Sequence, residues 1–245
     1  MVSAERPAVI PDLYWCIGLY GSGSTWLFNA GKKIAAACGL RAGLTSAFVT
    51  HNTELMFPPG TLTAIVKTHE TDAAAADTLA ERSLAIWLSV RDPRDCAASL
   101  MQYQDCSFDE ALEMTADAAA ACRTVLHHPR ARLFRFEDNF FDRPETLDAI
   151  AASFGHTLTA AARTRIFAET RRSAVESFIS SFPRVATVIA QPEQGHFVDL
   201  DTQWHSHHAG RDGVVGRWRS KLTREQSAAV VDRLSDAMNC FGYRV

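Results

Sequence analysis

The sequence lacks the features that mark membrane-spanning, disulfide-rich and polyanion-binding proteins. It has no run of about 18 apolar residues and no apolar segment after a basic N-terminus, which argues against a membrane span and against secretion. Its six cysteines are scattered, without a CxxC pair or a Cys/His spacing typical of zinc ligands. The formal net charge is −3, so no strong basic field attracts nucleic acid or an anionic membrane. We therefore expect a cytoplasmic protein with reduced thiols and no metal site.

Lysine is scarce as well, since only four of the 25 basic residues are lysines. In other respects the composition is ordinary for a globular protein, with 47% hydrophobic and 22% charged residues in a chain of 245. Such a length allows one large domain or two small ones. The sequence has no repeat, low-complexity tract or clear linker, so we expect a single domain over residues 1–245.

Strand-like and helix-like segments alternate along most of the chain. Apolar runs predict buried strands at residues 14–19, 62–67, 84–90 and 132–136. Strands that alternate with helices pair in parallel through right-handed crossovers. The fold class expected is therefore α/β, with a central parallel sheet flanked by helices and a mainly helical C-terminal third.

The helices are predicted from periodicity and from their start signals. Helical spacing favours helices at residues 25–38 and 72–81, and a third helix that begins at Pro93. Asp142 is expected to cap a helix that begins at Pro144 and ends near residue 154. Two capping boxes predict the remaining helices, namely Ser107 with Glu110 and Thr223 with Gln226.

A glycine-rich loop, GLYGSGST at residues 18–25, joins the first predicted strand to the first predicted helix. Its glycines let successive N–H groups face inward, and the helix N-terminus adds partial positive charge, which suits a phosphate or sulfate. The candidate binding residues are Gly21, Ser22, Gly23, Ser24 and Thr25. A nucleotide-triphosphatase loop has lysine directly before the Ser/Thr, and serine stands there instead, which disfavours an ATPase. A purely structural strand-to-helix turn is the alternative.

Three further motifs follow along the chain. Lys67-Thr68-His69 ends a predicted strand, and Arg91-Asp-Pro-Arg-Asp follows the next one, with Ser99 eight residues after Arg91. Open α/β sheets bind ligands at the carboxyl ends of strands, and arginine offers a two-pronged donor to phosphate. The last motif, RDGVVGRW at residues 211–218, precedes the C-terminal helix. Taken singly, the alternatives are a solvated strand end, a strand-to-helix turn and a glycine-rich surface loop.

In this order, the four motifs resemble those of the cytosolic-type and bacterial sulfotransferases. GSGSTWL at 21–27 is similar to the family's 5′-phosphosulfate loop, and 67–69 is similar to its K-T-H segment. Residues 91–99 look like its 3′-phosphate motif, and 211–218 resemble its C-terminal R-x-G-x-x-G-x-W segment. Residues 136–155 also look like a strand-and-helix segment of the family. The resemblance covers nearly the whole chain and implies the P-loop nucleotide-kinase-like fold of sulfotransferases.

The resemblance also implies an activity. The protein would transfer a sulfuryl group in line from 3′-phosphoadenosine 5′-phosphosulfate (PAPS) to a hydroxyl, or an amine, of a small-molecule or glycan acceptor, leaving the product PAP and using no metal. His69 would take the acceptor proton, with Glu70 as the second choice of base, and Lys67 would stabilise the charge of the transition state. Trp26 either stacks on the adenine or fills the core. The residues implied to hold the 3′ end of the nucleotide are Arg91, Ser99, Arg211, Asp212 and Gly213.

The sequence departs from the family pattern at Gly21, where the family usually has a basic residue. Lys32 is no substitute, because it lies ~10 Å further along the predicted helix. Backbone amides with Lys67, together with an arginine from a region that carries no assigned motif, are expected to supply this charge. The alternatives are a catalytically weak module that binds PAP or PAPS and, less favoured, a P-loop kinase or ATPase.

Two regions carry no assigned motif, residues 40–62 and 158–208, and we expect them to form the acceptor pocket. The second contains a histidine-rich stretch, His205-Ser-His207-His208. A loop that lines the acceptor cleft is the favoured interpretation of this stretch, and a metal site is the alternative.

Overall fold

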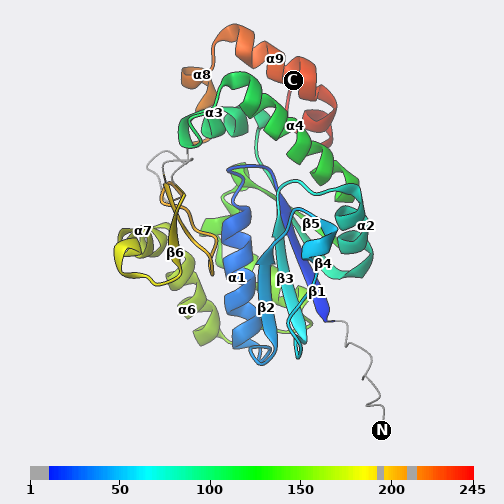
Figure 1. Cartoon of the computed structure of the whole chain (residues 1–245), viewed down its shortest axis with the longest axis vertical. Coiled ribbons are helices and arrows are strands. Elements are labelled where there is room, and N and C mark those ends of the chain that lie inside the picture. The colour runs from blue at the N-terminus through cyan, green and yellow to red at the C-terminus, as the bar shows by residue number, and fades with distance from the viewer. Residues whose placement is uncertain (1–10, 192–195, 209–213) are drawn as a thin grey trace.

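The computed structural model describes residues 11–191, 196–208 and 214–245 (Figure 1). Five strands form a parallel sheet in the order β2-β3-β1-β4-β5, which confirms the expected α/β class. The predicted strands are β1, β3, β4 and β5, all within two residues of the expected bounds, and the sequence analysis missed β2. The strands are β1 (Asp12–Gly18), β2 (Leu44–Phe48), β3 (Thr63–Thr68), β4 (Ser83–Val90) and β5 (Ala131–Arg135).

The predicted helices form close to their expected bounds, and both capping boxes are present. The capping role expected of Asp142 is wrong. The N-cap of the helix that begins at Pro144 is Arg143, which makes no side-chain cap, because Asp142 closes a tight 3-10 turn in which its N–H donates to the Asn139 carbonyl. These helices are α1 (Ser24–Ala37), α2 (Ala73–Arg82), α3 (Pro93–Tyr103), α4 (Phe108–Val125), α5 (Pro144–Ser153) and α9 (Arg224–Cys240).

The C-terminal third is mainly helical, as expected, and also contains an antiparallel hairpin. The hairpin lies beside α1 (Figure 1), and just after it the Thr202 carbonyl oxygen accepts a hydrogen bond from Asn29 Nδ2 of α1 at 2.7 Å. The further elements of this part are α6 (Ala160–Thr170), α7 (Arg172–Ser180), β6 (Val188–Gln191), β7 (His196–Asp199) and α8 (Trp218–Lys221).

The sheet is buried on both faces, as the apolar strands require. Alternate residues of β1 point to opposite sides, with Trp15 and Ile17 on one face and Tyr14 and Cys16 on the other. Helices α2, α3, α4 and α9 pack on the first side, and α1, α5 and α6 pack on the second. In Figure 1, α3, α8 and α9 lie beyond the carboxyl ends of the strands. No helix in the described ranges is long and apolar enough to cross a bilayer.

Candidate functional site

The sequence motifs meet at the carboxyl ends of three adjacent strands. β1 lies at the centre of the sheet. Strands β2 and β3 extend the sheet on one side of β1, and β4 and β5 extend it on the other, so the direction in which strands are added reverses at β1. Open α/β sheets bind ligands in the crevice at such a reversal. The glycine loop follows β1, Lys67 and His69 lie at the end of β3, and Arg91 follows β4 directly.

The glycine loop is held closed by Ser22, whose side chain is fully buried. Its hydroxyl donates to the Leu19 carbonyl oxygen at 2.6 Å and lies 2.8 Å from the hydroxyl of Ser89 on β4. The Ser22 N–H also donates to the Leu19 carbonyl oxygen. Ser22 therefore stabilises the conformation of the loop, since its hydroxyl and its N–H both donate to an acceptor within the loop.

The loop passes directly into the N-terminus of α1. The N-cap is Gly23, with φ of 90°, and it has no side chain to satisfy the first turn. The N–H groups of Ser24 and Thr25, the first two helical residues, have no acceptor within a helix. A helix start of this kind is suited to bind an anion, as the sequence predicts.

Gly21 lies where the loop touches α3. Its φ is 67°, and a Cβ atom at this position would lie 3.2 Å from the Ser99 hydroxyl oxygen and 3.6 Å from Arg91 Nη1. The structure therefore brings Gly21, Ser99 and Arg91 together at one point. The close approach also gives a physical reason for glycine here, because any side chain would crowd α3 in a strained backbone conformation.

Arg91 is the cation at the centre of this contact and is only 5% exposed. Its Nη1 donates to the Gly21 carbonyl oxygen at 3.2 Å and its Nη2 to the Val214 carbonyl oxygen at 3.1 Å. The guanidinium lies over the ring of Phe136, 4.3 Å from its centroid. The Nε atom is buried and makes no hydrogen bond within the described part of the chain. Arg91 thus retains a donor for a further acceptor.

Asp95 fastens the C-terminal motif to the start of α3. It is 1% exposed and accepts hydrogen bonds from the backbone N–H groups of Gly216 at 2.7 Å and Trp218 at 2.8 Å. Sequence reasoning quoted Asp95 within the Arg91 motif but assigned it no role. The predicted ligands Arg211, Asp212 and Gly213 lie outside the described residues.

Lys67 is buried at the end of β3, 3% exposed. Its Nζ lies 3.3 Å from His69 Nε2 and 4.9 Å from the centroid of the Phe48 ring. No carboxylate of the described residues lies within ion-pair distance of it. Burial lowers the pKa of Lys67 from 10.5 to about 8, because water no longer stabilises the charged form.

His69 is held in a single tautomer. Its Nδ1 lies 2.7 Å from the Gly18 carbonyl oxygen, which only accepts, so Nδ1 carries the hydrogen and Nε2 carries the lone pair. Burial, followed by the charge of Lys67, lowers the pKa of His69 well below 6.5. The ring is therefore neutral near pH 7, with its basic nitrogen beside the Lys67 ammonium group.

Tyr20 packs against His69 and was missed by sequence reasoning. The two rings are stacked, with centroids 4.3 Å apart and an interplanar angle of 19°. The Tyr20 hydroxyl donates to Glu70 Oε1 at 3.1 Å. Glu70, the second choice of base, thus holds the Tyr20 ring against His69, the first choice.

The side chains of Trp26 and Lys32 contact segments outside the four sequence motifs. Trp26 is 6% exposed, its Nε1 donates to the Thr170 carbonyl oxygen at 2.9 Å, and its ring packs edge-on against Phe140. These contacts account for Trp26 as a core residue and leave adenine stacking as a prediction. The Lys32 ammonium is 2.9 Å from Asp201 Oδ1.

The histidine-rich stretch packs as a cluster of rings. The centroids of His205, His207 and His208 are 4.8 to 5.3 Å apart, and His207 stacks on Tyr103 at 4.7 Å. Burial, followed by the charges of His207 and His205, lowers the pKa of His208 well below 6.5, and the charge of Lys67 acts in the same direction. This coupling is in keeping with a loop beside Lys67 and His69. Among the described residues, no three His, Cys, Asp or Glu side chains are arranged to hold a metal ion.

Comparison with solved structures identifies the fold. The mouse sulfotransferase SULT7A1 complexed with PAP matches with a TM-score of 0.64 and 17% identity, over 93% of this chain and 84% of that one. Retinol dehydratase with androsterone and the inactive cofactor PAP matches with 0.64 and 16%, over 97% and 84%. Retinol dehydratase with retinol and PAP matches with 0.65 and 15%, again over 97% and 84%. By sequence, no family model and no curated protein matches.

The chain therefore has the sulfotransferase fold, as its motifs predict. These three structures contain PAP, and two of them also contain androsterone or retinol. At 15 to 17% identity the likeness extends to the fold alone. Any functional assignment therefore rests on the residues described above.

Proposed function

We propose that this protein is a sulfotransferase that moves the sulfuryl group of PAPS to a hydroxyl, or an amine, of a small-molecule or glycan acceptor. The observation that carries the proposal is the contact at Gly21, where a backbone anion cradle meets the buried guanidinium of Arg91. PAPS has an anionic group at each end of one nucleoside, and two adjacent anion sites match that pattern. The fold is that of PAP-bound sulfotransferases, which supports the same assignment.

The residues present fit such a nucleotide. The buried Nε of Arg91 has no acceptor among the described residues, and a 3′-phosphate would supply one. The Ser99 hydroxyl and Arg91 Nη1 both lie close to Gly21, and this hydroxyl can donate to the same phosphate. The first-turn N–H groups of α1 are suited to the 5′ end. Arg211, Asp212 and Gly213 are proposed to complete the 3′ site.

When bound, PAPS supplies a sulfuryl group that passes to the acceptor oxygen as its bond to the 5′-phosphate breaks. His69 accepts the proton of that oxygen on Nε2, because Nδ1 is engaged with Gly18. In the structure the Lys67 ammonium donates to this same Nε2. A phosphate or sulfuryl oxygen is a stronger acceptor for an ammonium group than an imidazole is. Binding of the nucleotide would therefore draw Lys67 away and expose Nε2 to the acceptor.

Gly21 favours a second candidate, a module that binds PAP or PAPS and transfers poorly. Glycine offers no side-chain cation to the sulfuryl group, and the crowding by Ser99 and Arg91 leaves little space for one. The buried Lys67–His69 pair favours transfer instead, because a protein that only bound the nucleotide would have no need of this pair. A P-loop kinase is less favoured, since the loop has no lysine, and it would require ATP turnover with magnesium.

Turnover with a panel of acceptors tests the proposal. The purified protein is incubated with PAPS and with phenols, alcohols, amines, simple sugars, androsterone or retinol, and PAP release is measured together with the mass of the product. We expect acceptor-dependent PAP release and a product heavier by one sulfuryl group. Saturable PAP binding with no transfer to any acceptor would favour the binding module instead.

A further inference from the structure

Two hydrogen bonds join the glycine loop after β1 to the turn after β3. His69 Nδ1 donates to the Gly18 carbonyl oxygen at 2.7 Å, and the Tyr20 hydroxyl donates to Glu70 Oε1 at 3.1 Å. Each segment thus supplies one donor and one acceptor. The rings of Tyr20 and His69 are stacked as well, with centroids 4.3 Å apart. Gly18, Tyr20, His69 and Glu70 together form what we call the loop–base contact.

This contact fixes the plane of the His69 ring in addition to its tautomer. The torsion that turns an imidazole about its bond to Cβ has a broad energy minimum, so a hydrogen bond at Nδ1 alone leaves the ring plane loosely defined. The Tyr20 ring lies against the imidazole at an interplanar angle of 19°, which restricts that rotation. The position of His69 Nε2 therefore depends on a side chain of the glycine loop.

Tyr20 keeps its proton and so remains a hydrogen-bond donor. Its side chain is partly buried and packs against the main core. Burial, followed by the charge of Glu70, raises the pKa of Tyr20 above its usual value of 10. The hydroxyl therefore donates to the Glu70 carboxylate throughout the neutral range. This bond occupies Glu70 Oε1 as an acceptor and requires no proton transfer by Glu70.

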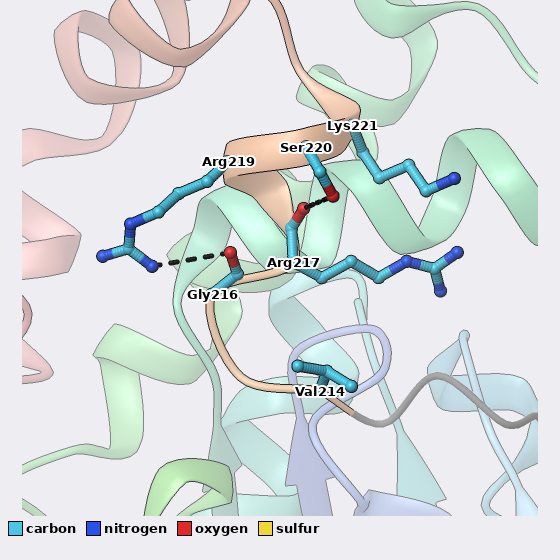
Figure 2. Close-up of a pocket in the computed structure, with 6 residues that line it drawn as sticks. All are labelled: Val214, Gly216, Arg217, Arg219, Ser220 and Lys221. Atoms are coloured by element: carbon cyan, nitrogen blue, oxygen red, sulfur yellow. Dashed lines mark hydrogen bonds between the residues drawn. The ribbon is translucent and has the colours of Figure 1, made fainter.

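The groups around His69 converge, whereas those of the open cavity lined by residues 214–221 diverge. That cavity has a volume of about 520 Å³. Figure 2 shows that the side chains of Arg219 and Lys221 extend to opposite sides of it. The Arg219 guanidinium donates to the Gly216 carbonyl oxygen within the same segment. The bonds of the loop–base contact instead join residues 50 and 51 positions apart and meet around one imidazole.

We propose that Tyr20 and Glu70 are positioning residues, in which the Glu70 carboxylate holds the Tyr20 ring and that ring directs His69 Nε2 toward the acceptor hydroxyl. This inference rests on the proposed function, in which His69 is the base. Glu70 then acts as a hydrogen-bond acceptor and not as a second base. Proton transfer requires the base to lie within hydrogen-bond reach of the reacting hydroxyl, and a displacement of about 1 Å can cost about 10²-fold in rate.

The origin of Tyr20 gives the contact a further role. Gly18 and Tyr20 belong to the loop whose N–H groups are proposed to hold the 5′ end of the nucleotide. One loop would therefore align both the sulfuryl donor and the base that serves the acceptor. This arrangement suits an in-line transfer, because donor and base must be placed relative to each other.

Four variants separate the roles of the ring, the hydroxyl and the carboxylate. Tyr20→Phe keeps the stacked ring and loses the bond to Glu70, whereas Tyr20→Leu loses both. Glu70→Gln keeps a side-chain oxygen that accepts from Tyr20, whereas Glu70→Ala does not. Tyr14→Phe is the matched control, because it removes the hydroxyl of a buried tyrosine near the start of β1, whose ring packs against Phe154 and Trp87.

Steady-state kinetics with PAPS and an acceptor of the unaltered protein give the first test. We expect kcat to fall about tenfold in Tyr20→Leu, while the KM for PAPS and the affinity for PAP stay nearly unchanged. Tyr20→Phe and Glu70→Ala should show a smaller fall, equal in the two variants because each removes the same bond. Glu70→Gln and Tyr14→Phe should behave as the unaltered protein does.

An unaltered kcat in Tyr20→Leu would overturn the proposal. So would a loss in Glu70→Gln as large as that in Glu70→Ala, because the carboxylate itself would then be the reacting group. Thermal unfolding and PAP binding show whether each variant folds. If Tyr20→Leu does not fold, Tyr20→Phe and Glu70→Ala decide, and an unaltered kcat in both would overturn the proposal.

Nitrogen-15 NMR of the His69 ring tests the contact without any transfer reaction. The signals of this ring are assigned by their loss in His69→Ala. The unaltered protein should show a single tautomer with the hydrogen on Nδ1, and Tyr20→Leu should show a mixture of both tautomers. An unchanged single tautomer in Tyr20→Leu would overturn the proposal. If the tautomers change as expected but no acceptor supports PAP release, the proposed function fails and the positioning of the ring by Tyr20 stands.

Discussion

The cations on the surface of α1, α5 and α6 have different surroundings from the cations at the carboxyl end of the sheet. On the outer face that α1 shares with α5 and α6, they sit in exposed ion pairs, with Lys33–Glu169 and Arg163–Asp148 both at 2.8 Å. At the carboxyl end of the sheet, Lys67 and Arg91 are buried. Lys67 has a neutral imidazole as its hydrogen-bond partner, and Arg91 Nη2 lies 3.5 Å from Asp95 Oδ2, a carboxylate that also accepts from two backbone N–H groups. Exposed pairs contribute little to stability, whereas a buried cation without full compensation costs folding free energy. The buried Lys67, which no carboxylate of the described residues pairs with, supports the placement of the proposed anion sites at the carboxyl end of the sheet.

The largest effect is expected at His69. His69→Ala removes the proton acceptor, and transfer should fall by about 10²–10⁴-fold while PAP affinity stays nearly unchanged. The low pKa of His69 also predicts a neutral base at pH 6.5 and above, so the rate should not fall there through its protonation. His127→Ala, in an exposed turn, is the control. Equal loss of transfer and of PAP binding in His69→Ala would contradict its assignment as the base.

Lys67→Met should abolish most transfer and stabilise the nucleotide-free protein. The pKa of Lys67 lies at about 8 in the fold against 10.5 when exposed, which corresponds to roughly 3 kcal/mol of destabilisation near neutral pH. Between these two values the unfolded state binds more protons, so the stability of the unaltered protein should rise as the pH rises from 8 to 10.5. Chemical denaturation across this range should show that rise, and the Met variant should lack it. A parallel pH profile in the two proteins would refute the burial argument.

Arg91→Ala should weaken PAP binding by about 1.5–3 kcal/mol, the value of a charged hydrogen bond. The variant also releases the Gly21 and Val214 carbonyls, so its folding is checked by thermal unfolding. Arg163→Ala, which breaks an exposed pair, should leave PAP affinity unchanged and cost less than about 1 kcal/mol of stability. An unaltered PAP dissociation constant in Arg91→Ala would remove this arginine from the site.

The smallest effect is expected at Gly21, and Gly39 provides a matched control. Both glycines have positive φ, 67° and 84°, but a Cβ atom at Gly39 meets nothing within 4 Å. Gly21→Ala and Gly39→Ala should each lose about 1–2 kcal/mol of unfolding free energy from the backbone conformation. Only Gly21→Ala should also weaken PAP binding, because it pushes against Ser99 and Arg91. Equal PAP affinity in the two variants would show that this contact is unimportant for the nucleotide.

The sequence was sufficient to predict the central sheet because its inner strands are continuous apolar runs. It missed β2, whose residues are only partly buried and therefore carry a mixed pattern. The hairpin of β6 and β7 was also missed, because its strands are only four residues long and some of its apolar residues, such as Ile189 and Phe197, are exposed and mark no buried face. Both lie in regions where no motif constrains the chain.

Single motifs predicted several residues of the candidate site but not the contacts between them. The sequence motifs name Lys67, His69, Arg91 and Ser99, but they do not show that Ser99 and Arg91 crowd Gly21. Contacts between distant segments escape such reasoning, as with Tyr20 stacked on His69 and Asp95 bonded to the Gly216 amide. These depend on strand order and on helix placement, which no local pattern encodes.

Calorimetric titration with PAP and with AMP tests the central claim most directly, because both ligands carry the 5′-phosphate and only PAP carries the 3′-phosphate that Arg91 would hold. The account predicts saturable PAP binding, more than about tenfold tighter than that of AMP. No saturable heat with PAP, or equal affinity for AMP, would contradict it.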